Sequence, residues 1–131
     1  AVLYLRTSTD GGANYDSGAS DYAYVWGSAS ASGISGGGDT SAAQVEILPG
    51  GVGNATGEHG VSGTIWVHGP HLAERTTLNG STNLVTASGN LIDFRLSGVR
   101  STNADVDAIR FLFSSGTIAS GTITMYGLRN S

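Results

Sequence analysis

Apolar and polar residues alternate along much of this chain, in short runs that are separated by turn-forming residues. Ile109, Phe111 and Phe113 would lie on one face of a strand, because successive side chains in a strand point to opposite faces. Ile123 and Met125 alternate with threonines in the same way. No long stretch has the periodicity of a helix. The pattern therefore predicts an all-β protein.

We expect about seven or eight short strands, a number and spacing typical of an antiparallel β-sandwich of jelly-roll type. One such domain would span residues 1–131, with the glycine- and serine-rich residues 27–41 as a flexible surface loop. Residues 101–107 could form a single helical turn. The expected strands cover residues 2–6, 22–26, 43–48, 62–68, 75–78 or 83–86, 91–96, 108–114 and 121–126.

Sequences that tolerate positive φ angles mark the expected turns between these strands. They are Asp10 with Gly11, Asn79 with Gly80, and Ser88 to Asn90 around Gly89.

The composition excludes several classes of protein. Of the 131 residues, 12% are charged, and the formal net charge is −4. This balance argues against nucleic acid as a partner. Cysteine is absent, which excludes disulfides, thiol catalysis and cysteine-ligated zinc. No apolar stretch is long enough to span a membrane, so we expect no membrane insertion.

Two loops carry patterns that are found at catalytic or metal-binding sites. Residues 33–37 match the G-x-S-x-G pattern of a nucleophile elbow, but their flexible flanks could not hold a strained serine. The acidic loop after the first strand could collect oxygen ligands for calcium. Its spacing is not that of an EF-hand, and capping of local turns explains the same residues, which are Asp10, Asn14, Asp16 and Asp21.

Two further clusters are weaker candidates. A zinc site would draw on a group of histidines and glutamates, namely Glu58, His59, His68, His71 and Glu74. Paired carboxylates for sugar cleavage are the second candidate, and structural ion pairs are the simpler explanation of the same residues, which are Asp93, Asp105 and Asp107 with Arg95, Arg100 and Arg110. We therefore expect no catalytic residue, no metal ion and no cofactor.

Four aromatic residues form the candidate interaction surface, namely Tyr22, Tyr24, Trp26 and Trp66. Exposed aromatic rings on a sheet can stack on sugar rings or anchor a protein interface. Tyr22, Tyr24 and Trp26 alternate, so they share one face of their strand. The sequence allows that face to be either the solvent-exposed one or the core.

Two segments, at opposite ends of the chain, resemble a known family. Residues 109–128 read IRFLFSSGTIASGTITMYGL, and residues 6–22 read RTSTDGGANYDSGASDY. They resemble the closing and opening segments of a β-domain found in structural proteins of tailed-bacteriophage virions. The resemblance implies a non-catalytic protein of the particle surface that is made in the host cytoplasm. It would be a tail-fibre or tail-tip type of domain that assembles with itself and contacts the host.

Two alternatives remain beside this interpretation. One is a capsid decoration protein that stabilises the phage head, and the other is a glycan-binding or glycan-degrading module. The expected partners are further copies of the chain, with a trimer as one state, or other virion proteins. Host-surface glycan is the expected ligand.

The resemblance also implies a closing hairpin with one half in residues 108–114 and the other in residues 121–126. Its core side chains would be Ile109, Phe111, Phe113, Ile123 and Met125. Burial of the last four would contribute about 6–12 kcal/mol before entropy is subtracted. The resemblance leads us to expect one strand before the VLYLR run that opens this chain. Either the chain is a fragment or a neighbour completes that sheet edge, so we expect a homo-oligomer or a strand donated by another chain.

Overall fold

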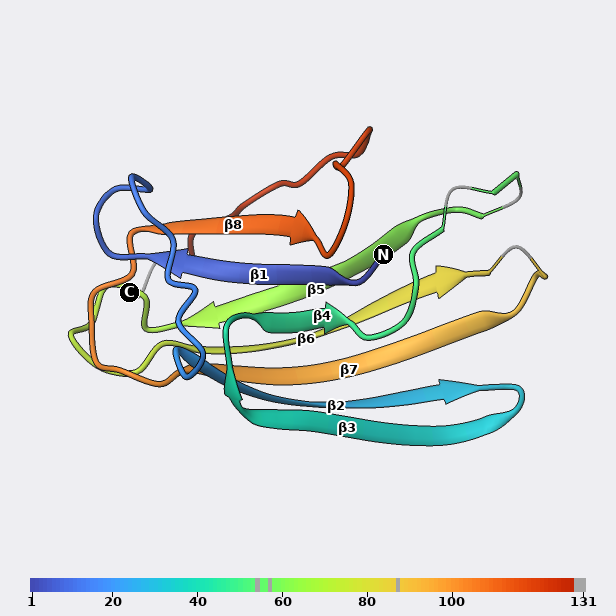
Figure 1. The fold of residues 1–131 in the computed structure, drawn as a ribbon, viewed down its shortest axis with the longest axis horizontal. Coiled ribbons are helices and arrows are strands. Elements are labelled where there is room, and N and C mark those ends of the chain that lie inside the picture. Colours follow the sequence, from blue (N-terminus) through green and yellow to red (C-terminus); the bar gives the residue numbers. More distant parts are fainter. Residues whose placement is uncertain (54, 57, 87, 129–131) are drawn as a thin grey trace.

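The computed structural model describes residues 1–53, 55–56, 58–86 and 88–128. Within them the chain forms antiparallel strands and no helix (Figure 1). The strands are β1 Leu3–Ser8, β2 Tyr22–Ser30, β3 Gly33–Ala42, β4 Val45–Leu48, β5 Val61–His68, β6 Thr77–Val85, β7 Leu91–Arg100 and β8 Ala108–Phe113. No helix in this described part could span a membrane.

The strands form two sheets that face each other. The smaller sheet has the order β4-β1-β8, and the larger sheet has the order β3-β2-β7-β6-β5. Strand β4 lies against β2, β6 and β7 of the larger sheet, and the two layers can be followed in Figure 1. This arrangement confirms the predicted all-β, antiparallel and sandwich-like class.

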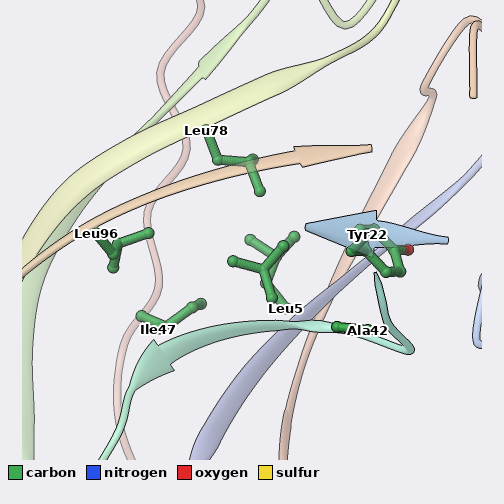
Figure 2. Packing of buried hydrophobic residues seen from close by; sticks show 7 residues of the cluster. Leu5, Tyr22, Ala42, Ile47, Leu78 and Leu96 are labelled. Carbon is green, nitrogen blue, oxygen red and sulfur yellow. The ribbon is translucent and has the colours of Figure 1, made fainter. Parts of the chain in front are cut away.

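The core lies between the two sheets, because alternate side chains of both sheets point inward. Figure 2 shows these side chains converging from both layers. The main cluster consists of Leu5, Tyr22, Ala42, Val45, Ile47, Leu78 and Leu96. A second buried cluster consists of Leu48, Leu84 and Phe94, and the ring of Trp26 meets that of Phe94 edge to face at 6.2 Å.

The aromatic residues of β2 belong to this core. Tyr22 is fully buried, and Tyr24 and Trp26 pack against the main cluster. A solvent-facing ladder of these three residues is therefore wrong, and the inward alternative is correct. A glycine makes room for one of the rings. Gly37 lies opposite Trp26, where a Cβ atom would come within 2.7 Å of the indole.

Two predicted loops are strands in the structure. Residues 27–41, expected as a flexible loop, form most of the β2–β3 hairpin, in which Ser30 pairs with Gly33. The predicted turn at Asn79 and Gly80 lies inside β6, which runs unbroken from Thr77 to Val85. Gly80 faces Ile65 at a place where a Cβ atom would collide with the backbone of β5. Its role is close approach between strands rather than a turn.

The other expected turns are present in part. Gly11 and Gly89 have φ angles of 71° and 80°, as the turn predictions require. The helical turn over residues 101–107 does not form. The N–H groups of Ala104 and Val106 donate instead to the carbonyl oxygens of Glu74 and Pro70, so this segment is held by the neighbouring loop.

The predicted closing hairpin forms only in its first half. Strand β8 contains Ile109, Phe111 and Phe113, which are half-buried, and the first two contact the main cluster. Residues 121–126 form no strand, and Ile123 and Met125 are 64% and 74% exposed. Their predicted place in the core is wrong. In the connection that follows β8, Gly116 and Gly121 have positive φ angles of 75° and 143°, a region that favours glycine.

Candidate functional site

The acidic loop between β1 and β2 caps its own turns. The Asp10 carboxylate accepts hydrogen bonds from the Asn14 backbone N–H at 2.9 Å, from the Asn14 side-chain amide at 2.8 Å and from the Ser8 hydroxyl at 2.7 Å. These bonds, led by those from Asn14, lower the pKa of Asp10 to about 2. Asp21 likewise accepts from the Gly18 N–H at 2.6 Å. Turn capping therefore accounts for these carboxylates.

Asp16 fastens the same loop to the body of the protein. The buried Arg100 donates from Nε and from a terminal nitrogen to Asp16 Oδ2, both at 2.9 Å. The Tyr22 hydroxyl donates to the Asp16 carbonyl oxygen at 3.2 Å and accepts from the Thr7 N–H at 2.7 Å. Burial is the main cause that raises the pKa of Tyr22. Each of these polar groups has a hydrogen-bond or ion-pair partner within the network, so the network holds the loop against the sheets.

The remaining chemical candidates are dispersed. Asp107 accepts from the Gly11 N–H at 2.8 Å, and the Arg110 guanidinium lies 5.7 Å from the centre of the Tyr15 ring. Arg100 pairs with Asp16 rather than with Asp93, Asp105 or Asp107. Ser35 lies on the exposed strand β3, without the strand-to-helix turn of a nucleophile elbow.

The histidines do not gather either. His68 lies on β5 and bonds Asn79 Oδ1 at 3.0 Å, whereas His59 and His71 are exposed in separate loops. Over the described ranges, no three histidine or acidic side chains come together in a way that could hold a metal ion.

One hollow opens between the two sheets at the edge of the smaller one. Its volume is about 330 Å³, and its walls include Tyr4, Tyr24, Gln44 and Glu46. Burial and the nearby Glu46 carboxylate raise the pKa of Tyr24 to about 12. Gln44 accepts a hydrogen bond at Oε1 from the Arg6 guanidinium at 2.6 Å. Its lining therefore combines the phenols of Tyr4 and Tyr24 with the carboxylates of Asp39 and Glu46.

A second hollow lies on the solvent face of the larger sheet, across β5, β6 and β7. Its volume is about 320 Å³, and it is lined by Thr64, Trp66, Asn79, Gly80, Ser81, Arg95, Leu96 and Ser97. Trp66 is 51% exposed. Of the four aromatic residues proposed as an interaction surface, Trp66 is the most exposed and lines this hollow, whereas Tyr24 is half-buried and lines the first hollow. The polar residues around it were not anticipated from the sequence.

Comparisons with protein-family models, with curated proteins and with solved structures found no match to this chain. Two exposed features of the described residues could contact a partner. These are the outer-face hollow beside Trp66, and the apolar residues that follow β8.

Proposed function

We propose that the chain is a non-catalytic structural module of a tailed-phage virion, of the tail-fibre or tail-tip type. It would be a jelly-roll-like sandwich that assembles with copies of itself and meets the host surface. The resemblance of residues 6–22 and 109–128 to virion β-domains motivates the proposal. The observation that carries it is an uncovered apolar segment after β8.

This segment, residues 117–128, is called the C-terminal segment below. It is exposed throughout, and its large apolar side chains are Ile118, Ile123, Met125, Tyr126 and Leu128, which are 42%, 64%, 74%, 83% and 75% exposed. Single exposed apolar residues are ordinary, but a contiguous group marks an interaction surface. In Figure 1 the chain after β8 runs back in the direction opposite to that strand.

Strand β8 lies at the end of the smaller sheet, where its described neighbour is β1. An edge strand presents unpaired N–H and C=O groups that can pair with another chain. Ile109 and Phe111 on β8 contact the core but remain half-buried. A further strand beside β8 would pair these backbone groups and cover both side chains.

The C-terminal segment has the sequence of such a strand. Ile123 and Met125 alternate with Thr122, Thr124 and Tyr126, so one face would be apolar when the segment is extended. A second copy of the chain has both the C-terminal segment and the sheet edge at β8, so each copy could offer its segment to the β8 edge of the other. Reciprocal strand addition would then use the same pair of surfaces in every copy.

The mass of the protein in solution tests this proposal. The native chain should form a closed oligomer at micromolar concentration, and the double variant Ile123→Ser/Met125→Ser should be monomeric. Both positions are exposed in the single chain, so the variant should keep its fold. The matched control Ile34→Ser, at a site on β3 that is 90% exposed, should keep the native mass. A monomeric native chain would contradict self-assembly.

The position on the particle separates this function from a close alternative. Copies found on the head by electron microscopy would favour a capsid decoration protein, for which the same exposed edge could bind the shell. Release of reducing sugar from bacterial envelope by the pure protein would contradict a non-catalytic role.

A further inference from the structure

The outer face of the larger sheet presents polar side chains in two rows. The first row runs from Trp66 on β5 through Asn79 on β6 to Ser97 on β7, and the second runs from Thr64 through Ser81 to Arg95. Neighbouring strands lie about 4.8 Å apart, so each row spans about 10 Å. The side chains of Trp66 and Arg95 are long and those between them are short, and this difference in length leaves the hollow of about 320 Å³.

Several hydrogen-bonding groups in the hollow are available to a ligand. In the described part of the chain, the one ion pair joins Arg100 and Asp16, which leaves the Arg95 guanidinium without a carboxylate there. The Asn79 amide oxygen is held by His68 at 3.0 Å. The Thr64, Ser81 and Ser97 hydroxyls are exposed. Donors and acceptors thus surround a half-exposed indole on a rigid sheet.

We infer that this hollow binds a carbohydrate, with a sugar ring stacked on the indole of Trp66 and its hydroxyls bonded by the Asn79, Ser81, Ser97 and Arg95 side chains. The inference rests on the proposed function, because it names the ligand class of the host-facing surface. A sugar has an apolar face of C–H groups and a rim of hydroxyls. It therefore matches one flat aromatic ring among alternating polar groups.

Other ligand classes fit this face poorly. Nucleic acid binding depends on several cations that neutralise phosphates, and Arg95 is the one cationic side chain in the hollow. An apolar small molecule needs an enclosed and mostly apolar pocket, whereas this hollow is open and Trp66 is its one large apolar side chain, since the Leu96 side chain belongs to the buried core. A protein interface would have a larger apolar centre than one indole.

The test begins with the native protein on an array of bacterial O-antigen and capsular polysaccharides, followed by calorimetric titration of a bound polysaccharide. We expect Trp66→Ala to weaken binding about tenfold or more, equivalent to about 1.4 kcal/mol, and Trp66→Phe to weaken it less. The matched control is Leu91→Ala. Leu91 lies on the same strand face as Arg95, is 60% exposed and does not line the hollow. Its replacement should leave the affinity unchanged.

Fluorescence provides a second readout, because the chain has two tryptophans and Trp26 packs against the core. Saturation with the polysaccharide should change the emission of Trp66, and the change should be absent in Trp66→Ala. Three outcomes would overturn the inference: no polysaccharide binds, Trp66→Ala binds as tightly as the native chain, or Trp66→Ala loses the oligomeric mass. The last would identify this face as a contact between copies.

The two proposals can fail separately. The double variant Ile123→Ser/Met125→Ser changes the C-terminal segment and leaves the hollow intact. A monomeric variant that keeps its per-chain affinity for the polysaccharide would support both proposals. Polysaccharide binding by a native chain that is itself monomeric would retain the carbohydrate site and reject self-assembly.

Discussion

At the scale of single residues, two buried threonines differ in whether the hydroxyl group has a hydrogen-bond partner. Thr76 and Thr82 are 0% and 3% exposed. The Thr82 hydroxyl donates to the Ile47 carbonyl oxygen at 3.0 Å and so joins β6 of the larger sheet to β4 of the smaller. The Thr76 hydroxyl oxygen has no partner within the described residues. A buried polar group without a partner is destabilising, whereas a satisfied one contributes to stability.

This difference predicts opposite effects for the same substitution. Thr76→Val should leave the free energy of unfolding unchanged or raise it by up to about 1 kcal/mol, since it removes an unpaired hydroxyl at nearly constant volume. Thr82→Val should lower it by about 1–2 kcal/mol, since the Ile47 carbonyl oxygen loses its donor. Urea denaturation of both variants measures the two changes. Equal losses at both sites would contradict this interpretation.

At the scale of elements, Gly98 sets the distance between the two sheets. It lies on β7, and a Cβ atom there would come 2.8 Å from Cγ1 of Val45 on β4 and 3.4 Å from Cδ1 of Leu78 on β6. A methyl group would therefore overpack the main cluster. Such contacts cannot be relieved without shifting one strand against another, because the interior is close-packed.

Gly98→Ala should destabilise the fold by about 1–3 kcal/mol. The matched control is Gly27→Ala on β2, where the nearest atom to a new Cβ is the Ser35 carbonyl oxygen at 3.9 Å, and it should have little effect. Combining Gly98→Ala with Val45→Ala should cost less than the sum of the two single changes, because the second makes room for the first. Thermal or chemical denaturation measures the free energy of unfolding of the native chain, the two single variants and the double variant. Strict additivity of the two single changes in the double variant would argue against a steric cause.

The same elements show what could be predicted from the sequence. Alternation correctly located seven strand regions, because it depends on neighbours along the chain. Alternation did not predict the roles of the glycines. Gly80 and the glycines of residues 33–38 were assigned to turns or loops, whereas several of them allow close approach to a partner strand. Which of these roles a glycine plays depends on the strand opposite, and single-sequence patterns do not contain that information.

The strand predicted in the C-terminal segment is absent from the structure, and the sequence could not show this for a related reason. Its alternation is as regular as that of β8, but alternation along the chain does not show whether a segment pairs with a neighbouring strand. The hollow beside Trp66 was missed because its residues come from three strands and meet only through their register. A sequence reading that aligned the polar positions of neighbouring strands could have found them.

At the scale of the whole molecule, the two layers are unequal in width. Three strands face five, and the edge strand β8 keeps Ile109 and Phe111 half-buried. The single chain thus leaves part of its apolar surface near β8 accessible, together with the apolar side chains of the C-terminal segment. If a second copy covers both, folding and association are linked, since a partner that binds only the folded chain stabilises it by mass action.

Linkage predicts that the melting temperature of the native chain rises with protein concentration. A partner at about 100 times its Kd adds about 2.7 kcal/mol, and in a domain of this size each kcal/mol raises Tm by about 3–5 °C. Scanning calorimetry over a wide range of concentration measures this slope. In Ile123→Ser/Met125→Ser the slope should vanish while the melting temperature at high dilution stays near that of the native chain, because neither side chain is buried within one copy. A flat profile for the native chain would contradict assembly. A slope that survives in the variant would place the contact on another surface.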